Sequence, residues 1–137
     1  MTIVLDTNVL VSALLRPVTP PALVLDLVLS RQINVALDER IFAKYADVLA
    51  RGELHLPSDR VTAVLDFLWR GAERIRAATL PIRLPDPDDV MFIEVAVSAL
   101  VGALVTGNTR HYPAAQRHGV RVLTPREYLA EWSEGRA

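Results

Sequence analysis

The stretch "LPDPDDVMFIEVAVSALVGALVTGN", residues 84–108, joins an acidic cluster to a long apolar run that ends in the strand-like segment "ALVT" (103–106). This order is typical of one helix followed by one buried strand. The helix is expected from Pro87 to Val101, because Asp86 suits the N-cap and proline suits the first helical position. Like charges this close together repel, so their position at the edge of a buried segment needs a physical reason.

The rest of the chain repeats the alternation of strands and helices on both sides of this stretch. Strands are expected at 2–5, 33–37, 103–106 and 120–123. Helices are expected at 8–14, 22–32, 39–51, 59–75, 87–101, 113–118 and 124–132, with Asp38, Ser58 and Thr124 as caps. The alternation predicts an α/β layer structure with a mostly parallel sheet, in a single domain over residues 1–137.

Composition limits the class of protein. Of 137 residues, 51% are hydrophobic and 23% are charged, which favours a folded chain over a disordered one. The absence of cysteine excludes a disulfide scaffold and thiolate chemistry, and it fits a cytoplasmic protein. No signal-peptide pattern opens the chain, and the most apolar stretch is interrupted by Glu94, Ser98 and Gly102, so no membrane span is expected. The net charge of −1 gives no global basic field, and Lys44 is the only lysine among 15 basic residues.

Polar residues end two of the expected strands. Asp6 closes the first strand, and the segment Thr106-Gly107-Asn108 closes the strand "ALVT". Ligands of open parallel sheets bind beyond the carboxyl ends of the strands. The helix that leads into "ALVT" must begin at the same edge, so Asp86 and Asp89 are expected to face Asp6 and Asn108 across one crevice. Converging carboxylates need a neutralising cation, and oxygen ligands suit Mg²⁺ or Mn²⁺.

A purely structural interpretation of each signal stays open. The sequence "DPDD" is also a good helix start, since acids in the first turn interact favourably with the helix dipole. The "TPRE" segment at 124–127 has the same pattern with no implied chemistry. An Asp after a strand and a Gly-Asn pair are both common turn residues.

The chain resembles a PIN domain of the kind found in VapC-like toxins of bacterial toxin–antitoxin pairs. The resemblance lies in four blocks in the right order and spacing, "VLDTNVLVSALL", "LPDPDDVMFIEVA", "ALVTGNTRHYP" and "VRVLTPREYL". It implies a three-layer α/β/α sandwich around a sheet of four to five strands. It also implies a metal-dependent endoribonuclease, a hydrolase that uses Mg²⁺ or Mn²⁺, with a cognate antitoxin and a homodimer as partners.

The resemblance also assigns roles to particular residues. Asp6 matches the first acid and Asp89 the third, and these two are the expected metal ligands. Asp86 lies beside them, Asn108 stands where many members have a fourth acid, and Asn8 matches a supporting polar residue.

Lys44 departs from the family pattern, because it stands where the helix after the second strand usually supplies a second acid. Three explanations are open. Glu39 or Asp47 substitutes for the missing acid; the site holds one metal and Lys44 contacts phosphate; or catalytic activity has been lost. The last explanation would leave a PIN-like RNA-binding or regulatory protein.

RNA binding at an acidic site needs nearby cations. Arg16, Arg110 and His111 are expected on loops at the same edge as weak candidates for substrate contacts, although each is also an ordinary surface residue. Tyr112 is expected to pack in the interior, with stacking on a base as the alternative. A phosphotransfer enzyme with Asp6 as nucleophile is disfavoured, because no late-strand lysine and no phosphate-binding glycine loop exist.

Overall fold

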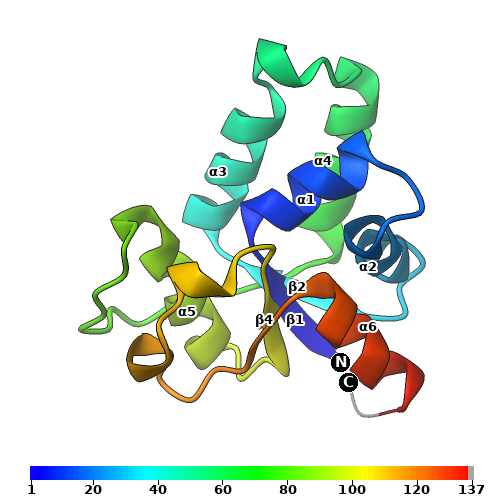
Figure 1. Cartoon of the computed structure of the whole chain (residues 1–137). Coiled ribbons are helices and arrows are strands. Elements are labelled where there is room, and N and C mark those ends of the chain that lie inside the picture. Colours follow the sequence, from blue (N-terminus) through cyan, green and yellow to red (C-terminus); the bar gives the residue numbers. More distant parts are fainter. Residues whose placement is uncertain (136–137) are drawn as a thin grey trace.

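Five parallel strands form the centre of the computed structural model, which describes residues 1–135 (Figure 1). The strand order is β3-β2-β1-β4-β5, and every neighbouring pair is parallel. The strands are β1 (Thr2–Leu5), β2 (Asn34–Leu37), β3 (Glu73–Arg74), β4 (Ala103–Val105) and β5 (Val122–Leu123). Helices cover both faces, so the expected three-layer α/β fold with a parallel sheet of up to five strands is confirmed.

Six helices surround the sheet. They are α1 (Thr7–Leu15), α2 (Pro20–Leu29), α3 (Glu39–Leu49), α4 (Ser58–Gly71), α5 (Val90–Ser98) and α6 (Pro125–Ser133), with 3₁₀ turns η1 (Gly52–Leu54), η2 (Pro87–Asp89), η3 (Thr109–His111) and η4 (Ala114–Gln116). Helix α5 packs on β1, β2 and β4, while α6 packs on β4 and β5 from the other face (Figure 1). Helices α3 and α4 rise together beyond the upper end of the sheet in this view.

Of the helix caps expected at Asp38, Ser58 and Thr124, two are confirmed. Asp38 Oδ1 accepts a hydrogen bond from the backbone N–H of Ile41 at the start of α3. Thr124 and Glu127 form a reciprocal capping box at α6. Ser58 is instead the first residue of α4 and caps nothing with its side chain, because Pro57 occupies the N-cap position.

The helix expected at 59–75 ends earlier in the structure than the sequence predicted. Helix α4 stops at Gly71, and the chain then extends into the two-residue edge strand β3. This strand is fixed by pairing with β2 and by a hydrogen bond from Ile75 N to Leu37 O, which are contacts that no local pattern encodes.

The other differences are at element ends. The helix expected at 87–101 begins with the 3₁₀ turn η2 and ends at Ser98, followed by Leu100 in the left-handed conformation at φ 53°. The helix expected at 113–118 is only the short turn η4, and the last strand is limited to its two final residues.

The apolar character of α5 is explained by burial inside the chain. Phe92, Ile93 and Val95 are fully buried. Its two polar residues bind the preceding segment: Glu94 accepts hydrogen bonds from Arg40 and from the backbone N–H of Leu80, both at 2.8 Å. Ser98 in turn accepts a hydrogen bond from Ala78 N at 3.1 Å. The helix therefore leaves no apolar face that requires a second copy of the chain.

Within residues 1–135, no single helix is long and apolar enough to cross a membrane. Helices α1 and α2 reach the required length and composition only as a pair, and they are bent by 99° relative to each other.

Candidate active site

The central strands place two polar residues side by side at the carboxyl edge of the sheet. From β1 the chain proceeds to β2 and β3 on one side, and later to β4 and β5 on the other. The gap between the ends of β1 and β4 is therefore the topological switch point, where ligands of open α/β sheets bind. Leu5 pairs with Val105, so Asp6 and Thr106 directly follow paired residues at this point.

Asp6 is buried and held by two hydroxyl groups. Its Oδ2 atom accepts a hydrogen bond from Thr106 Oγ1 at 2.9 Å and another from the Tyr112 hydroxyl at 2.8 Å. Only 3% of Asp6 is exposed. Its Oδ1 atom accepts no hydrogen bond within the described residues. The carboxylate is thus fixed in orientation, with one oxygen available to a ligand.

Asn8 and Thr106 support Asp6 from the neighbouring turn. Asn8 Oδ1 accepts a hydrogen bond from Gly107 N at 2.9 Å, and Asn8 Nδ2 lies 3.5 Å from Thr106 Oγ1. A Cβ atom at Gly107 would lie 3.2 Å from Asn8 Oδ1, so a larger residue there would push the Asn8 side chain away by a few tenths of an ångström. Thr106 therefore contacts the Asp6 carboxylate directly, and Asn8 contacts Thr106 and the turn that follows it.

Asp89 belongs to the same electrostatic site. It is 3% exposed, and Lys44 Nζ lies 3.4 Å from its Oδ1 atom. Its Oδ2 atom is buried and accepts no hydrogen bond, although His111 Nδ1 lies 3.4 Å away. Burial and the nearby charge of Asp6 raise the pKa of Asp89, and Lys44 opposes this increase. Asp89 makes no capping hydrogen bond with its side chain, unlike the buried cap Asp38, so helix capping does not account for its burial.

Asp86 and Asn108 act as caps in this structure. Asp86 is exposed, and its Oδ1 atom accepts a hydrogen bond from Asp88 N at 2.9 Å at the start of η2. Asn108 Oδ1 accepts a hydrogen bond from Arg110 N at 3.2 Å at the start of η3. Neither side chain contacts Asp6 or Asp89 by a hydrogen bond, although the charge of Asp86 contributes to the raised pKa of Asp89. Both residues border the site, and their local role is the structural one.

The structure brings Lys44 into the site and leaves both proposed substitute acids outside it. The ammonium group of Lys44 contacts Asp89 and lies 5.4 Å from the centre of the Phe92 ring. Asp47 pairs with Arg51 on the surface, and Glu39 is exposed on the first turn of α3. No group of three acids or histidines arranged to hold a metal exists among residues 1–135. The explanation that Glu39 or Asp47 replaces the missing acid therefore finds no support.

The three cations expected near the substrate are not equally placed. His111 lies beside Asp89, and Arg110 is exposed on the same 3₁₀ turn. Arg16 follows the last residue of α1, a helix of nine residues that begins at Thr7, directly after Asp6. That length separates Arg16 from the Asp6 backbone by about 14 Å. His111 and Arg110 thus border the site, and Arg16 does not.

The donor set suits one divalent ion. Mg²⁺ is commonly held by one or two carboxylates together with water and substrate phosphate. Asp6 and Asp89 are two such carboxylates, and the buried Oδ2 atom of Asp89 lacks any hydrogen-bond donor. Lys44, whose ammonium group lies 3.4 Å from Asp89, stands where the resemblance implied a further acid.

Two tyrosines that support Asp6 were missed by sequence reasoning. Tyr112 is fully buried, so the expected packing is confirmed and stacking on a base is excluded, and its hydroxyl group also donates a hydrogen bond to Asp6. Tyr45 donates a short hydrogen bond to the carbonyl of Leu5, the residue before Asp6. Burial and the charge of Asp6 raise the pKa of both tyrosines, so both remain protonated donors at neutral pH. No spacing rule in the sequence indicates these contacts.

A comparison with known families agrees with this geometry. A family model for the PIN domain matches residues 2–110, which include Asp6, Lys44, Asp89 and Asn108. No curated protein matches the chain.

Proposed function

Because the chain belongs to the PIN domain family, whose members are generally nucleases, we propose that it is a metal-dependent endoribonuclease. The observation that carries the proposal is the pair of buried carboxylates, Asp6 and Asp89, beside the β1–β4 switch point. Lys44 and His111 lie next to Asp89, and burial together with the charge of Asp6 raises the pKa of Asp89.

In this proposal Asp6 and Asp89 hold one Mg²⁺ or Mn²⁺ ion, and Asp86 and Asn108 border the site. A bound divalent ion neutralises charge on the scissile phosphate and activates water for attack. Thr106 and Tyr112 keep Asp6 in a fixed orientation. Lys44 offsets part of the acidic charge and offers an ammonium group to a substrate phosphate, with His111 and Arg110 as further cations at the rim.

The proposal is tested by RNA cleavage with purified protein. Single-stranded and loop RNA should be cut with Mg²⁺ or Mn²⁺, and EDTA should stop the reaction. Asp6→Asn and Asp89→Asn should each lower the rate by a factor of 10² or more, an order of magnitude typical for removal of a direct electrostatic contributor. Asp66→Asn is the matched control, because Asp66 is an exposed acid on α4 that pairs only with Arg70. Equal rates for Asp6→Asn and the parent protein would refute the assignment.

The contact between Lys44 and Asp89 favours a second candidate function, an inactive PIN domain that binds or regulates RNA. In that case Lys44 serves as a built-in cation, and the protein needs no metal. Calorimetry with Mn²⁺ separates the two functions: the nuclease binds the ion with a measurable heat, and the inactive protein does not.

The resemblance to VapC-like toxins extends the proposal to partners. We infer that the chain forms a homodimer and binds a cognate antitoxin protein. Both inferences rest on the resemblance of the four sequence blocks named above. An antitoxin gene would be encoded directly beside the gene for this chain, so the adjacent reading frame provides the simplest test. Co-expression of that neighbour should relieve any growth arrest caused by the chain alone.

A further inference from the structure

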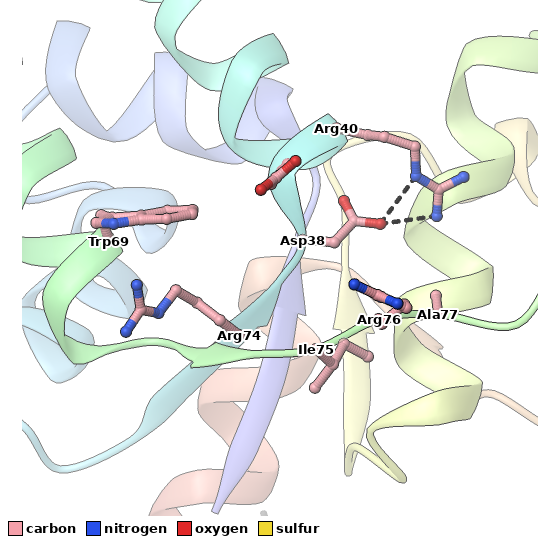
Figure 2. Close-up of a pocket in the computed structure, with 8 residues that line it drawn as sticks. Asp38, Arg40, Trp69, Arg74, Ile75, Arg76 and Ala77 are labelled. Atoms are coloured by element: carbon pink, nitrogen blue, oxygen red, sulfur yellow. Dashed lines mark hydrogen bonds and ion pairs between the residues drawn. The ribbon is translucent and has the colours of Figure 1, made fainter.

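A second feature of the carboxyl edge is a cavity of about 630 Å³ beyond the ends of β2 and β3 (Figure 2). Its walls are Asp38–Arg40 at the start of α3, Trp69 of α4, and the extended segment Arg74–Ala77. The volume lies in the range of sites for small ligands. None of the residues assigned to the Asp6–Asp89 site lines this cavity.

In one wall of the cavity a guanidinium group is stacked over an aromatic ring, and this pair is called the Trp69–Arg74 platform. The guanidinium carbon of Arg74 lies 4.8 Å from the centre of the Trp69 ring. Behind it, the Phe42 ring lies 4.9 Å from Trp69 and fixes its position. Figure 2 shows Trp69 and Arg74 together at one side of the cavity and Arg40 at the other. Nucleic-acid bases stack on both kinds of planar group.

The charge of the cavity favours a ligand with an anionic part. Asp38 and Arg40 form an ion pair at 2.8 Å, and Arg40 also pairs with Glu94, so these charges are satisfied. Arg74 and Arg76 are exposed, and their side chains have no hydrogen-bond or ion-pair partner in the part of the chain that the structure describes.

The exposed acid Glu39 also lines the cavity and reduces its positive charge. A carboxylate at such a position can accept a hydrogen bond from the amino group of a base. The cavity therefore combines a stacking platform, two arginines without an ion-pair partner among the described residues, and one hydrogen-bond acceptor. This combination suits the base and phosphate of a nucleotide better than a simple anion.

The cavity is joined to the candidate active site by the surface of α3. Arg40 lines both this cavity and a second groove of about 610 Å³ between α3 and α5, which Lys44 also lines. Arg40 and Lys44 are four residues apart on α3 and so lie on one face of the helix. β3 lies two strand spacings from β1, or roughly 10 Å. An extended single strand can follow this route from Lys44 to Trp69.

We propose that this cavity binds one nucleotide of a single-stranded RNA. This nucleotide lies further along the RNA chain than the phosphate bound at Asp6 and Asp89. The base stacks on the Trp69–Arg74 platform, and Arg76 binds a phosphate. The substrate class rests on the proposed function, but binding at this cavity requires neither metal nor cleavage.

The test uses the full chain with Trp132→Phe, which leaves Trp69 as the only tryptophan. A short single-stranded RNA of mixed sequence is titrated in EDTA, and Trp69 fluorescence is followed. We expect saturable quenching. The double variant Arg74→Ala/Arg76→Ala should weaken binding about tenfold or more, because it removes the guanidinium group on which the base stacks and the cation that binds phosphate. Arg70→Ala is the matched control, since Arg70 is exposed on the same helix as Trp69 and pairs only with Asp66.

Unchanged fluorescence on addition of RNA, or equal affinities for the double variant and the Arg70→Ala control, would overturn the proposal. Circular dichroism of each variant shows that it is folded. If RNA binds at Trp69 in EDTA but no metal supports cleavage, the nuclease function fails and this site stands. If cleavage is seen and its KM is unaffected by Arg74→Ala/Arg76→Ala, the nuclease function stands and this site fails.

Discussion

The hydroxyl group of Tyr112 donates a 2.8 Å hydrogen bond to Asp6, although 106 positions separate the two residues in the chain. Thr106 donates to the same carboxylate oxygen. The two donors leave Asp6 Oδ1 without a hydrogen bond among the described residues. A buried phenol with a raised pKa stays protonated at neutral pH, so this arrangement persists under ordinary conditions.

Tyr112→Phe should therefore impair the Asp6 site and cost about 1 kcal/mol of stability, because a buried carboxylate loses a donor. We expect weaker Mn²⁺ binding, measured by calorimetry, and a lower kcat with little change in KM. Tyr128→Phe is the matched control, because Tyr128 is also buried but its hydroxyl has no hydrogen-bond partner. Equal Mn²⁺ affinities for the two variants would show that Tyr112 only fills space.

Lys44→Glu should strengthen divalent binding roughly tenfold or more, since affinity at oxygen sites depends on the number of charged ligands. Lys44→Met should give an intermediate affinity, because it removes the positive charge without adding a ligand. Titration with Mn²⁺ measures both. Arg51→Glu is the control for charge reversal just beyond the end of the same helix, where Arg51 pairs with the exposed Asp47. The cleavage rate then separates two roles of Lys44: a decrease despite tighter metal binding indicates a contact with phosphate, and an increase indicates a site that had lost its acid.

Asp89→Asn should raise the stability of the metal-free protein at neutral pH. The pKa of Asp89 is raised in the folded state, so its ionised form disfavours folding, and this penalty is present above the ordinary pKa range of a carboxyl group. Urea unfolding in EDTA should show a higher midpoint for the variant at pH 7, by an amount that shrinks as the pH falls through the raised pKa of Asp89 and is gone below the ordinary carboxyl value of about 4. Asp66→Asn should show no such gain, since Asp66 is exposed and pairs with Arg70. A less stable Asp89→Asn protein would mean that the Lys44 pair outweighs the repulsion from Asp6.

The sequence predicted those parts of the fold and site that local chemistry determines. Short patterns of residue type predict the strand that ends just before Asp6, the cap at Asp38 and the capping box at Thr124. All three are confirmed. The strand β3 could not be predicted, because its two exposed residues carry no apolar alternation and depend on pairing with β2.

The same distinction holds at the candidate site. Asp6 and Thr106 were found because parallel strands bring their carboxyl ends to one edge. The contact between Tyr112 and Asp6 depends on how η3 folds back over that edge, and the pairing of Lys44 with Asp89 depends on the packing of α3 beside α5. Such contacts arise from tertiary structure and leave no periodic signal.

Hydrogen bonds join the long connection between β3 and η2 to helix α5. The backbone N–H of Ala78 donates to Ser98, and that of Leu80 donates to Glu94. A third bond joins Arg83 N to Gln116. Connections of this length without regular structure are often lids over a binding site. Here the backbone of the connection is hydrogen-bonded to α5 at two places before it reaches Asp86. We therefore expect the connection to hold the acidic turn in position and not to open and close above it.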